Sequence, residues 1–242
     1  MSQPFLTAEW RRLALVNYAV DPTVLQPYVP AGTALDLWKG RCYLSLVGFM
    51  FKDTRLRGMP IPYHRDFEEV NLRFYVTRTE GEVVKRGVVF IREIVPRPAL
   101  TWVARSVYGE PYRTMPMGHA HQQVSGDLVV QYNWHCGRRE HALDVVADAE
   151  ACELERGSEA EFITEHYWGY TRVDARRTRE YEVRHPRWRV HRVRHIRLNV
   201  DLGRLYGERF AFLNDLAPTS VLLAEGSPVQ VMGGRRLPSP AS

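Results

Sequence analysis

The stretch Glu68-Glu69-Val70-Asn71-Leu72-Arg73-Phe74-Tyr75-Val76 alternates strictly between polar and apolar side chains. Side chains of a strand repeat with period two, so the two sets lie on opposite faces of one predicted strand. The face with Val70, Leu72, Phe74 and Val76 needs a core to pack on. The other face carries Glu69, Asn71, Arg73 and Tyr75. It is either a solvated face or the wall of a polar cavity.

The rest of the chain is dominated by short strand patterns that are separated by turn residues. Strands are predicted at residues 14–20, 34–38, 41–50, 68–78, 83–95, 119–124, 128–136, 167–171, 179–184, 189–198 and 220–231. The polar segment 137–157 is predicted to be a strand and loop on the surface. Such a pattern is typical of a mainly β protein with few helices.

Short helices are predicted between some of these strands. Asp21 is a suitable N-cap for a helix that begins at Pro22. Ser158 and Glu161 form a capping-box pattern. Apolar spacing favours further helices at 100–108 and 205–213. We therefore expect one mainly β domain over residues 1–232, built as a curved or closed antiparallel barrel or cone, and a disordered tail at 233–242.

Composition limits the classes to which the protein can belong. The 242 residues are 45% hydrophobic and 25% charged, which is ordinary for a globular protein. No apolar run approaches the roughly 18 residues that a membrane span needs, and the N-terminus lacks the pattern of a secretory signal. The chain has three cysteines, an odd number, and no two of them are close in sequence: Cys42, Cys136 and Cys152. We expect reduced thiols and a cytoplasmic location.

Positive charge comes almost entirely from arginine. The formal net charge is +5, and Lys39, Lys52 and Lys85 are the lysines of the chain. Arginine binds carboxylate and phosphate groups with two parallel hydrogen bonds. A compositional bias toward arginine explains most of these residues equally well, and we favour that interpretation for them.

Several segments resemble a known bacterial family. The resemblance is carried by Glu68–Val76, Gly87-Val88-Val89-Phe90, Phe162-Ile163-Thr164-Glu165-His166-Tyr167-Trp168-Gly169-Tyr170 and Ala224-Glu225-Gly226-Ser227. The chain is similar to the YqjF-like (DUF2071) family, which is placed in the acetoacetate decarboxylase-like superfamily. The resemblance implies a cone-like β-barrel that holds a small oxo acid inside, and it implies a homo-oligomer.

The chain departs from the decarboxylase at the catalytic turn. The decarboxylase has Gly-x-Pro-Lys-Lys, whereas this chain has Gly109-Glu110-Pro111-Tyr112-Arg113. By this resemblance Tyr112 occupies the position of the Schiff-base lysine, Arg113 that of its activator, and Glu69 resembles an active-site acid. A phenol cannot form an imine, and the three lysines are predicted to be solvated. Any catalysis is expected to be lyase-like acid/base chemistry without an imine.

The candidate site follows from these residues. Glu69, Tyr112 and Arg113 are the candidate catalytic residues. The candidate residues for binding a small organic acid are Arg73, Arg92, Asn71 and His64. No cofactor is predicted. Two alternatives remain open: the polar residues are a solvated strand face with a loop arginine, or the protein binds a ligand or assembles without catalysis.

Three other patterns have simpler explanations. His119, His121 and His135 lack a repeated metal-ligand spacing, so no metal site is expected. The basic ribbon at 184–197 could bind nucleic acid, but a solvated edge or pairing with the acidic segment 148–161 is favoured. His166 could act in acid/base catalysis beside Glu165, but a core position on the face shared with Trp168 and Tyr170 is favoured.

Overall fold

A computed structural model describes residues 3–60, 63–99, 101–102 and 109–237. The strands are β1 Leu6–Val20, β2 Ala34–Leu35, β3 Leu37–Trp38, β4 Arg41–Leu56, β5 Met59–Pro60, β6 Phe67–Glu80, β7 Val83–Val95, β8 Tyr112–Thr114, β9 Met117–Val124, β10 Asp127–Cys136, β11 Arg139–Cys152, β12 Trp168–Arg172, β13 Thr178–Arg184, β14 Val190–Asn199, β15 Ser220–Val231 and β16 Arg235–Arg236. The α-helices are α1 Pro22–Leu25, α3 Glu159–Thr164 and α4 Leu202–Tyr206, and the 3₁₀ segments are Gln26–Tyr28 and Glu208–Asn214. The mainly β class is confirmed.

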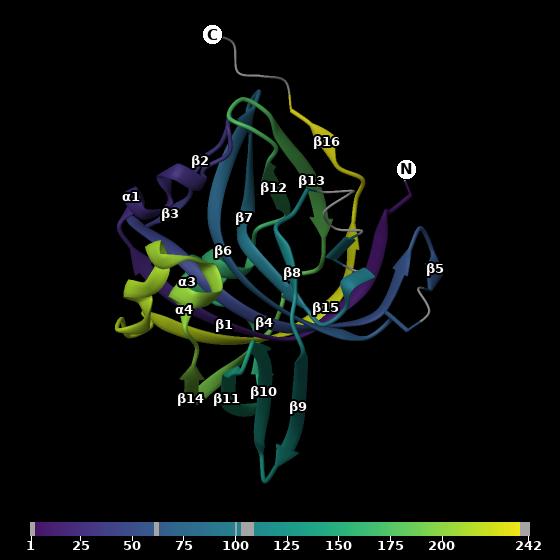
Figure 1. The fold of residues 1–242 in the computed structure, drawn as a ribbon, viewed down its shortest axis with the longest axis vertical. Coiled ribbons are helices and arrows are strands. Elements are labelled where there is room, and N and C mark those ends of the chain that lie inside the picture. Colours follow the sequence, from purple (N-terminus) through teal and green to yellow (C-terminus); the bar gives the residue numbers. More distant parts are fainter. Residues whose placement is uncertain (1–2, 61–62, 100, 103–108, 238–242) are drawn as a thin grey trace.

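The strands form one strongly curved sheet whose ends meet (Figure 1). Along the chain of pairings, the order is β13-β12-β7-β6-β4-β1-β15. Val183 of β13 pairs with Val231 of β15, which closes this run into a ring. The pairing between strands is antiparallel, as predicted, except at β7, which pairs in parallel with both β12 and β8.

A second group of strands leaves the ring at β15. β14, β11, β10 and β9 follow in that order and project from the ring at the bottom of Figure 1. Val70, Leu72 and Phe74 belong to one buried apolar cluster with Tyr132 and Trp134 of β10. The apolar face of the 68–76 stretch therefore packs on a core, as predicted.

The predicted helix starts at Asp21 and Ser158 are confirmed. The Asp21 carboxylate accepts a hydrogen bond from the Thr23 backbone N–H at 2.8 Å, and Pro22 opens α1. The Ser158 hydroxyl accepts from the Glu161 N–H at 3.1 Å. Glu161 in turn accepts from the Gly157 N–H at 2.5 Å. Both caps supply acceptors for N–H groups that the first turn of a helix leaves without partners.

Two other segments differ from the prediction. Segment 137–157 is not only a surface element, because Leu143, Val145 and Ala147 of β11 are buried in the core. In the predicted tail 233–242, Arg235–Arg236 pair with β13 and Leu237 is buried. Residues 238–242 lie outside the described residues, as does most of the predicted helix at 100–108.

The basic ribbon is paired with acidic side chains. Arg187 contacts Glu161 at 2.5 Å, and Arg194 forms an ion pair with Asp148. β14 lies beside β11 in the sheet, which brings the two oppositely charged segments together. The predicted pairing of the basic ribbon with the acidic segment is confirmed.

Candidate functional site

A cavity of about 160 Å³ lies within the ring of strands. Each strand of the ring contributes inward side chains, and so does β8. From β6 these are Phe67, Glu69, Asn71 and Arg73. The polar face of the opening stretch is therefore the wall of a cavity, because Glu69, Asn71 and Arg73 are all buried.

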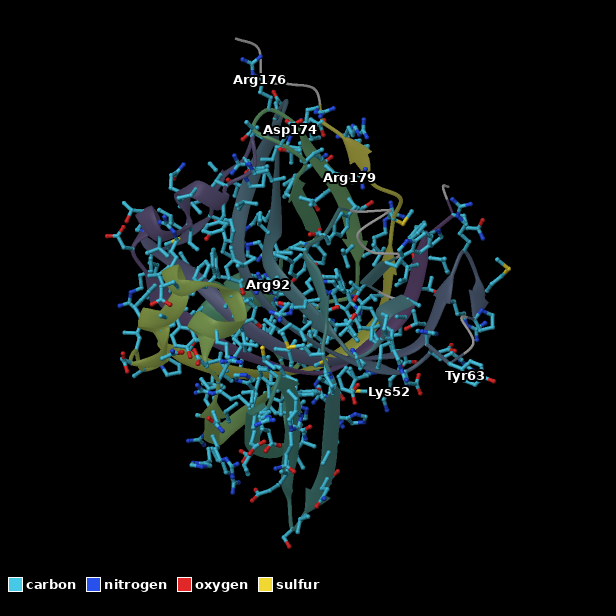
Figure 2. All side chains as sticks on the ribbon, viewed as in Figure 1. Lys52, Tyr63, Arg92, Asp174, Arg176 and Arg179 are labelled. Atoms are coloured by element: carbon cyan, nitrogen blue, oxygen red, sulfur yellow. The ribbon has the colours of Figure 1, made fainter. Side chains whose placement is uncertain are left out.

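A β-bulge in β7 decides which charged residue of that strand enters the cavity. Arg73 pairs with Phe90, and Leu72 pairs with Arg92, so Ile91 is an extra residue in β7. An extra residue reverses the faces of all that follow. Arg92 therefore shares the core side with Leu72 and donates to the Leu205 carbonyl in α4, where Figure 2 shows it near the middle of the molecule. The expectation that Arg92 binds substrate in the cavity is not met, and Glu93 lines the cavity instead.

The turn at 109–113 brings two more polar side chains into the cavity. Tyr112 begins β8, and parallel pairing places it beside Glu93 of β7. Glu110 lies two residues before Tyr112 and is 4% exposed. Both line the cavity, but Arg113 is exposed and is not among the lining residues. The structure thus separates Arg113 from Tyr112, since successive residues of a strand point to opposite faces.

Three glutamates form a buried acidic cluster with hydroxyl donors. Glu69 accepts from the Tyr112 hydroxyl and from the Asn71 amide, each at 2.9 Å. Glu110 accepts from Thr171 at 2.5 Å and from Tyr181 at 3.0 Å. The third carboxyl belongs to Glu93, which is 2% exposed. Its Oε2 atom has no hydrogen-bond partner among the described residues.

Burial shifts the titration of the acidic cluster. It raises the pKa of Glu69 to about 7, against the opposing hydrogen bonds of Asn71 and Tyr112. It also raises the pKa of Glu110 to about 7. The pKa of Glu93 is raised well above its ordinary value by burial and by the charges of the other two glutamates. The cluster therefore keeps protons near neutral pH, and a neutral carboxyl can donate a hydrogen bond.

Arg73 is the cation of the cavity wall. It is 7% exposed, and its guanidinium lies 5.8 Å from the centre of the Tyr75 ring. Among the described residues, its Nε atom has no hydrogen-bond partner, and its charge acts on the Glu69 carboxyl without a direct ion pair. A buried charge without a direct ion-pair partner is costly. Arg73 is thus suited to bind an anionic group of a ligand.

His166 also lines the cavity, although the sequence favoured a core role for it. Its Nε2 atom lies 3.1 Å from an Asp36 carboxylate oxygen, which also accepts from Arg86 at 2.7 Å. Burial lowers the pKa of His166 to about 4, so the ring is neutral at pH 7. Since Asp36 is an acceptor, Nε2 carries the proton and Nδ1 has a free lone pair. Nδ1 is buried without a partner among the described residues.

None of the chain's lysines lines the cavity. Lys39 and Lys52 are exposed, as expected, and Figure 2 shows Lys52 at the surface. The expectation that Lys85 is solvated is wrong. Its side chain is 10% exposed, contacts Glu180 at 3.2 Å and lies 4.0 Å above the Trp168 ring.

The structure brings together Glu69, Asn71, Arg73, Tyr112 and His64 as lining residues. Sequence reasoning missed Glu93 and Glu110. Glu110 stands inside the turn that the sequence singled out, so its position was an available signal. For Glu93 the sequence contains no such signal, because the bulge in β7 decides that this residue faces the cavity. In the described part of the chain, no group of three or more His, Cys, Asp and Glu side chains is arranged to hold a metal ion. None of the described helices has the length and hydrophobicity needed to cross a bilayer.

The fold is similar to that of several solved structures. An acetoacetate decarboxylase from Legionella pneumophila has a TM-score of 0.64 at 12% identity, covering 99% of this chain and 90% of that one. An acetoacetate decarboxylase-like enzyme from Sphingomonas wittichii has a TM-score of 0.66 at 15% identity, covering 99% and 95%. The enduracididine biosynthesis enzyme MppR in complex with pyruvate has a TM-score of 0.64 at 14% identity, covering 99% and 93%.

Sequence comparison assigns the family. The uncharacterized protein YqjF of Bacillus subtilis is 33% identical over 104 residues, which are 43% of this chain and 41% of that relative. The aligned part is thus less than half the length of that relative. The model of the family DUF2071, described as an uncharacterized conserved protein, matches residues 7–228. The chain therefore belongs to the DUF2071 family.

Proposed function

We propose that this protein binds a small oxo acid in its cavity and transfers a proton at the carbon beside the carbonyl group, without forming an imine. The observation that carries the proposal is Arg73, a buried cation with no ion pair among the described residues. A ligand carboxylate would supply the missing partner. MppR, which has a similar fold, is complexed with pyruvate, a molecule of this class.

The acidic cluster supplies the groups that proton transfer needs. With a pKa of about 7, Glu69 is matched to accept a proton near neutral pH. When the proton leaves carbon, the electron pair moves to the carbonyl oxygen. A protonated Glu93 beside Glu69 would donate a hydrogen bond to this oxygen. The Tyr112 hydroxyl donates to Glu69 in the free protein, and it would turn to this oxygen once Glu69 holds the proton. The same enol-like species is an intermediate in the cleavage or formation of the adjacent carbon–carbon bond, which is lyase-like chemistry.

Ligand binding tests the role of Arg73. Pyruvate and 2-oxobutanoate should stabilise the wild-type protein, by about 2.7 kcal/mol at a hundredfold excess over Kd. Arg73→Met should abolish this gain. Arg113→Met is the matched control, since it removes an exposed arginine outside the cavity. Equal stabilisation of Arg73→Met and wild type would refute the proposed anchor.

Isotope exchange tests the chemistry separately. In heavy water, the wild-type protein should incorporate deuterium at C3 of a bound 2-oxo acid, and Glu69→Gln should bind the acid but lose the exchange. Borohydride should trap no adduct, because no lysine lines the cavity. An adduct on any lysine would contradict the proposal. Binding without exchange in the wild type would favour the alternative, a non-catalytic ligand-binding protein.

Two properties belong to the proposal as well. We propose a cytoplasmic location, which the free cysteines Cys42, Cys136 and Cys152 support. We also propose a homo-oligomer. Native mass spectrometry tests the second point, since a monomer at micromolar concentration would contradict it.

A further inference from the structure

The cavity has an aromatic section beyond the acidic cluster. Trp10, Phe49, Phe51, Phe67 and Trp188 line it, and we call these five residues the aromatic chamber. The ring centres of Trp10 lie 5.3 Å from Phe49, 5.8 Å from Phe51 and 6.3 Å from Trp188. Phe51 and Phe67 are stacked at 4.6 Å. Such walls favour a flat apolar group, because aromatic rings prefer contacts of this kind.

The strand register separates the aromatic chamber from Arg73. Trp10 pairs with Phe51, which pairs with Phe67, so the three lie in one row across β1, β4 and β6. Arg73 lies six positions farther along β6. At ~3.3 Å per residue, the two backbone positions are roughly 20 Å apart. The side chains of Arg73 and of the chamber residues extend from these positions into the same cavity. A three-carbon acid on Arg73 has no group to fill the chamber, whereas an acid with a ring has one.

Two polar atoms at the chamber end have no partner. The indole Nε1 of Trp10 and the hydroxyl of Thr54 are buried, and neither forms a hydrogen bond with any described residue. Both residues line the cavity. A buried donor left without an acceptor costs about 1–3 kcal/mol. An acceptor on a bound molecule would remove this cost.

The size of the cavity agrees with a single ring. Its volume is about 160 Å³, and an engineered apolar cavity of about 150 Å³ in another protein binds benzene. The volume therefore allows one ring with a short chain.

We infer that the ligand is an aryl oxo acid: its carboxylate binds Arg73, its ring lies in the aromatic chamber, and a hydrogen-bonding substituent on the far side of the ring meets Trp10 Nε1 and the Thr54 hydroxyl. The Arg73 end of this inference rests on the proposed function. The chamber end is independent, because it follows from the aromatic walls and the two unpartnered polar atoms.

Calorimetry with three acids tests the inference. The probes are pyruvate, 3-phenyl-2-oxopropanoate and 3-(4-hydroxyphenyl)-2-oxopropanoate. Burial of the phenyl ring should tighten binding by about tenfold to a hundredfold over pyruvate. Trp10→Phe keeps a ring but removes the N–H group. It should weaken binding of the hydroxyphenyl acid by about fivefold and leave the phenyl acid nearly unchanged. Trp38→Phe is the matched control, since Trp38 does not line the cavity.

The outcomes separate this inference from the proposed function. If pyruvate binds as tightly as the aryl acids and still needs Arg73, the aryl ligand class is overturned while the proposed function stands. If no oxo acid binds, both fall. If Trp10→Phe weakens both aryl acids equally, the role of the N–H group is overturned. Thr54→Val, which replaces a hydroxyl by a methyl group, repeats the comparison should Trp10→Phe fold poorly. It should again weaken only the hydroxyphenyl acid.

Discussion

Glu69→Gln should change how the stability of the protein depends on pH. Glu69 is 2% exposed, and its pKa is raised from 4.5 to about 7. Each pKa unit corresponds to about 1.4 kcal/mol, so this rise corresponds to about 3 kcal/mol of unfolding free energy. The glutamine variant keeps the shape of the side chain but has no proton to lose.

The sign of the effect follows from the proton count of each state. At pH 4 the Glu69 carboxyl is largely protonated in both states and adds little. Between about pH 4.5 and 7 the unfolded chain releases this proton while the folded protein keeps it, so rising pH favours unfolding. Above about pH 7 the Glu69 carboxyl is ionised in both states, and the unfolding free energy of the wild type falls no further on this account. The wild type should therefore lose about 3 kcal/mol relative to Glu69→Gln across this interval.

Urea unfolding from pH 4.5 to 8 measures this difference. Glu140→Gln, which changes an exposed carboxylate, is the control. The changed hydrogen bonds to Asn71 and Tyr112 add an offset that is the same at every pH. The informative quantity is therefore how the difference in unfolding free energy between wild type and Glu69→Gln changes with pH. If this difference in unfolding free energy stays constant from pH 4.5 to 8, the reasoning that burial holds the proton on Glu69 is refuted.

Three further predictions concern the ring and the cavity. Gly169→Ala should lower Tm by an amount equivalent to about 1–3 kcal/mol, because the new Cβ would lie 2.1 Å from the Tyr181 ring; an unchanged Tm would contradict the close contact. Glu180→Ala should cost about 3–5 kcal/mol in denaturant unfolding, since it leaves the buried Lys85 ammonium without its inner partner; a cost below about 1 kcal/mol would show that the pair is solvated. Binding of an oxo acid near pH 7 should be accompanied by proton uptake, because the ligand carboxylate neutralises Arg73, whose charge lowers the pKa of the Glu69 carboxyl. Calorimetry in buffers of different ionisation enthalpy should give different binding enthalpies. Equal binding enthalpies in all buffers would contradict proton uptake.

The wall of the cavity could be predicted from sequence because it lies on one regular strand. Glu69, Asn71 and Arg73 share a face of β6 by the period of two, and no bulge interrupts the strand between them. The sequence left open whether this face is solvated. That question depends on strands far away in the chain, since Val183 and Val231 close the ring. Local patterns do not contain this information.

The charged residues of β7 could not be assigned, because their faces depend on one inserted residue. Ile91 reverses the alternation, so Glu93 faces the cavity and Arg92 faces the core. The exposure of Arg113 has a different cause that the sequence did contain. Tyr112 and Arg113 are successive residues of β8, and successive residues of a strand cannot face the same cavity.

Unpartnered polar atoms along the cavity support the proposed ligand site. Native interiors leave few buried polar atoms without hydrogen bonds. Among the described residues, the buried side chains with such an atom include six that line this one cavity, namely Trp10, Thr54, Asn71, Arg73, Glu93 and His166. Each such atom costs about 1–3 kcal/mol, and a core built only for stability would contain apolar side chains at these positions. The atoms lie along the cavity from the aromatic chamber to the acidic cluster, and they include both donors and acceptors. A molecule with an anionic end, a central carbonyl and a polar group at its far end would satisfy them together, whereas water could satisfy the polar atoms but not the aromatic walls between them.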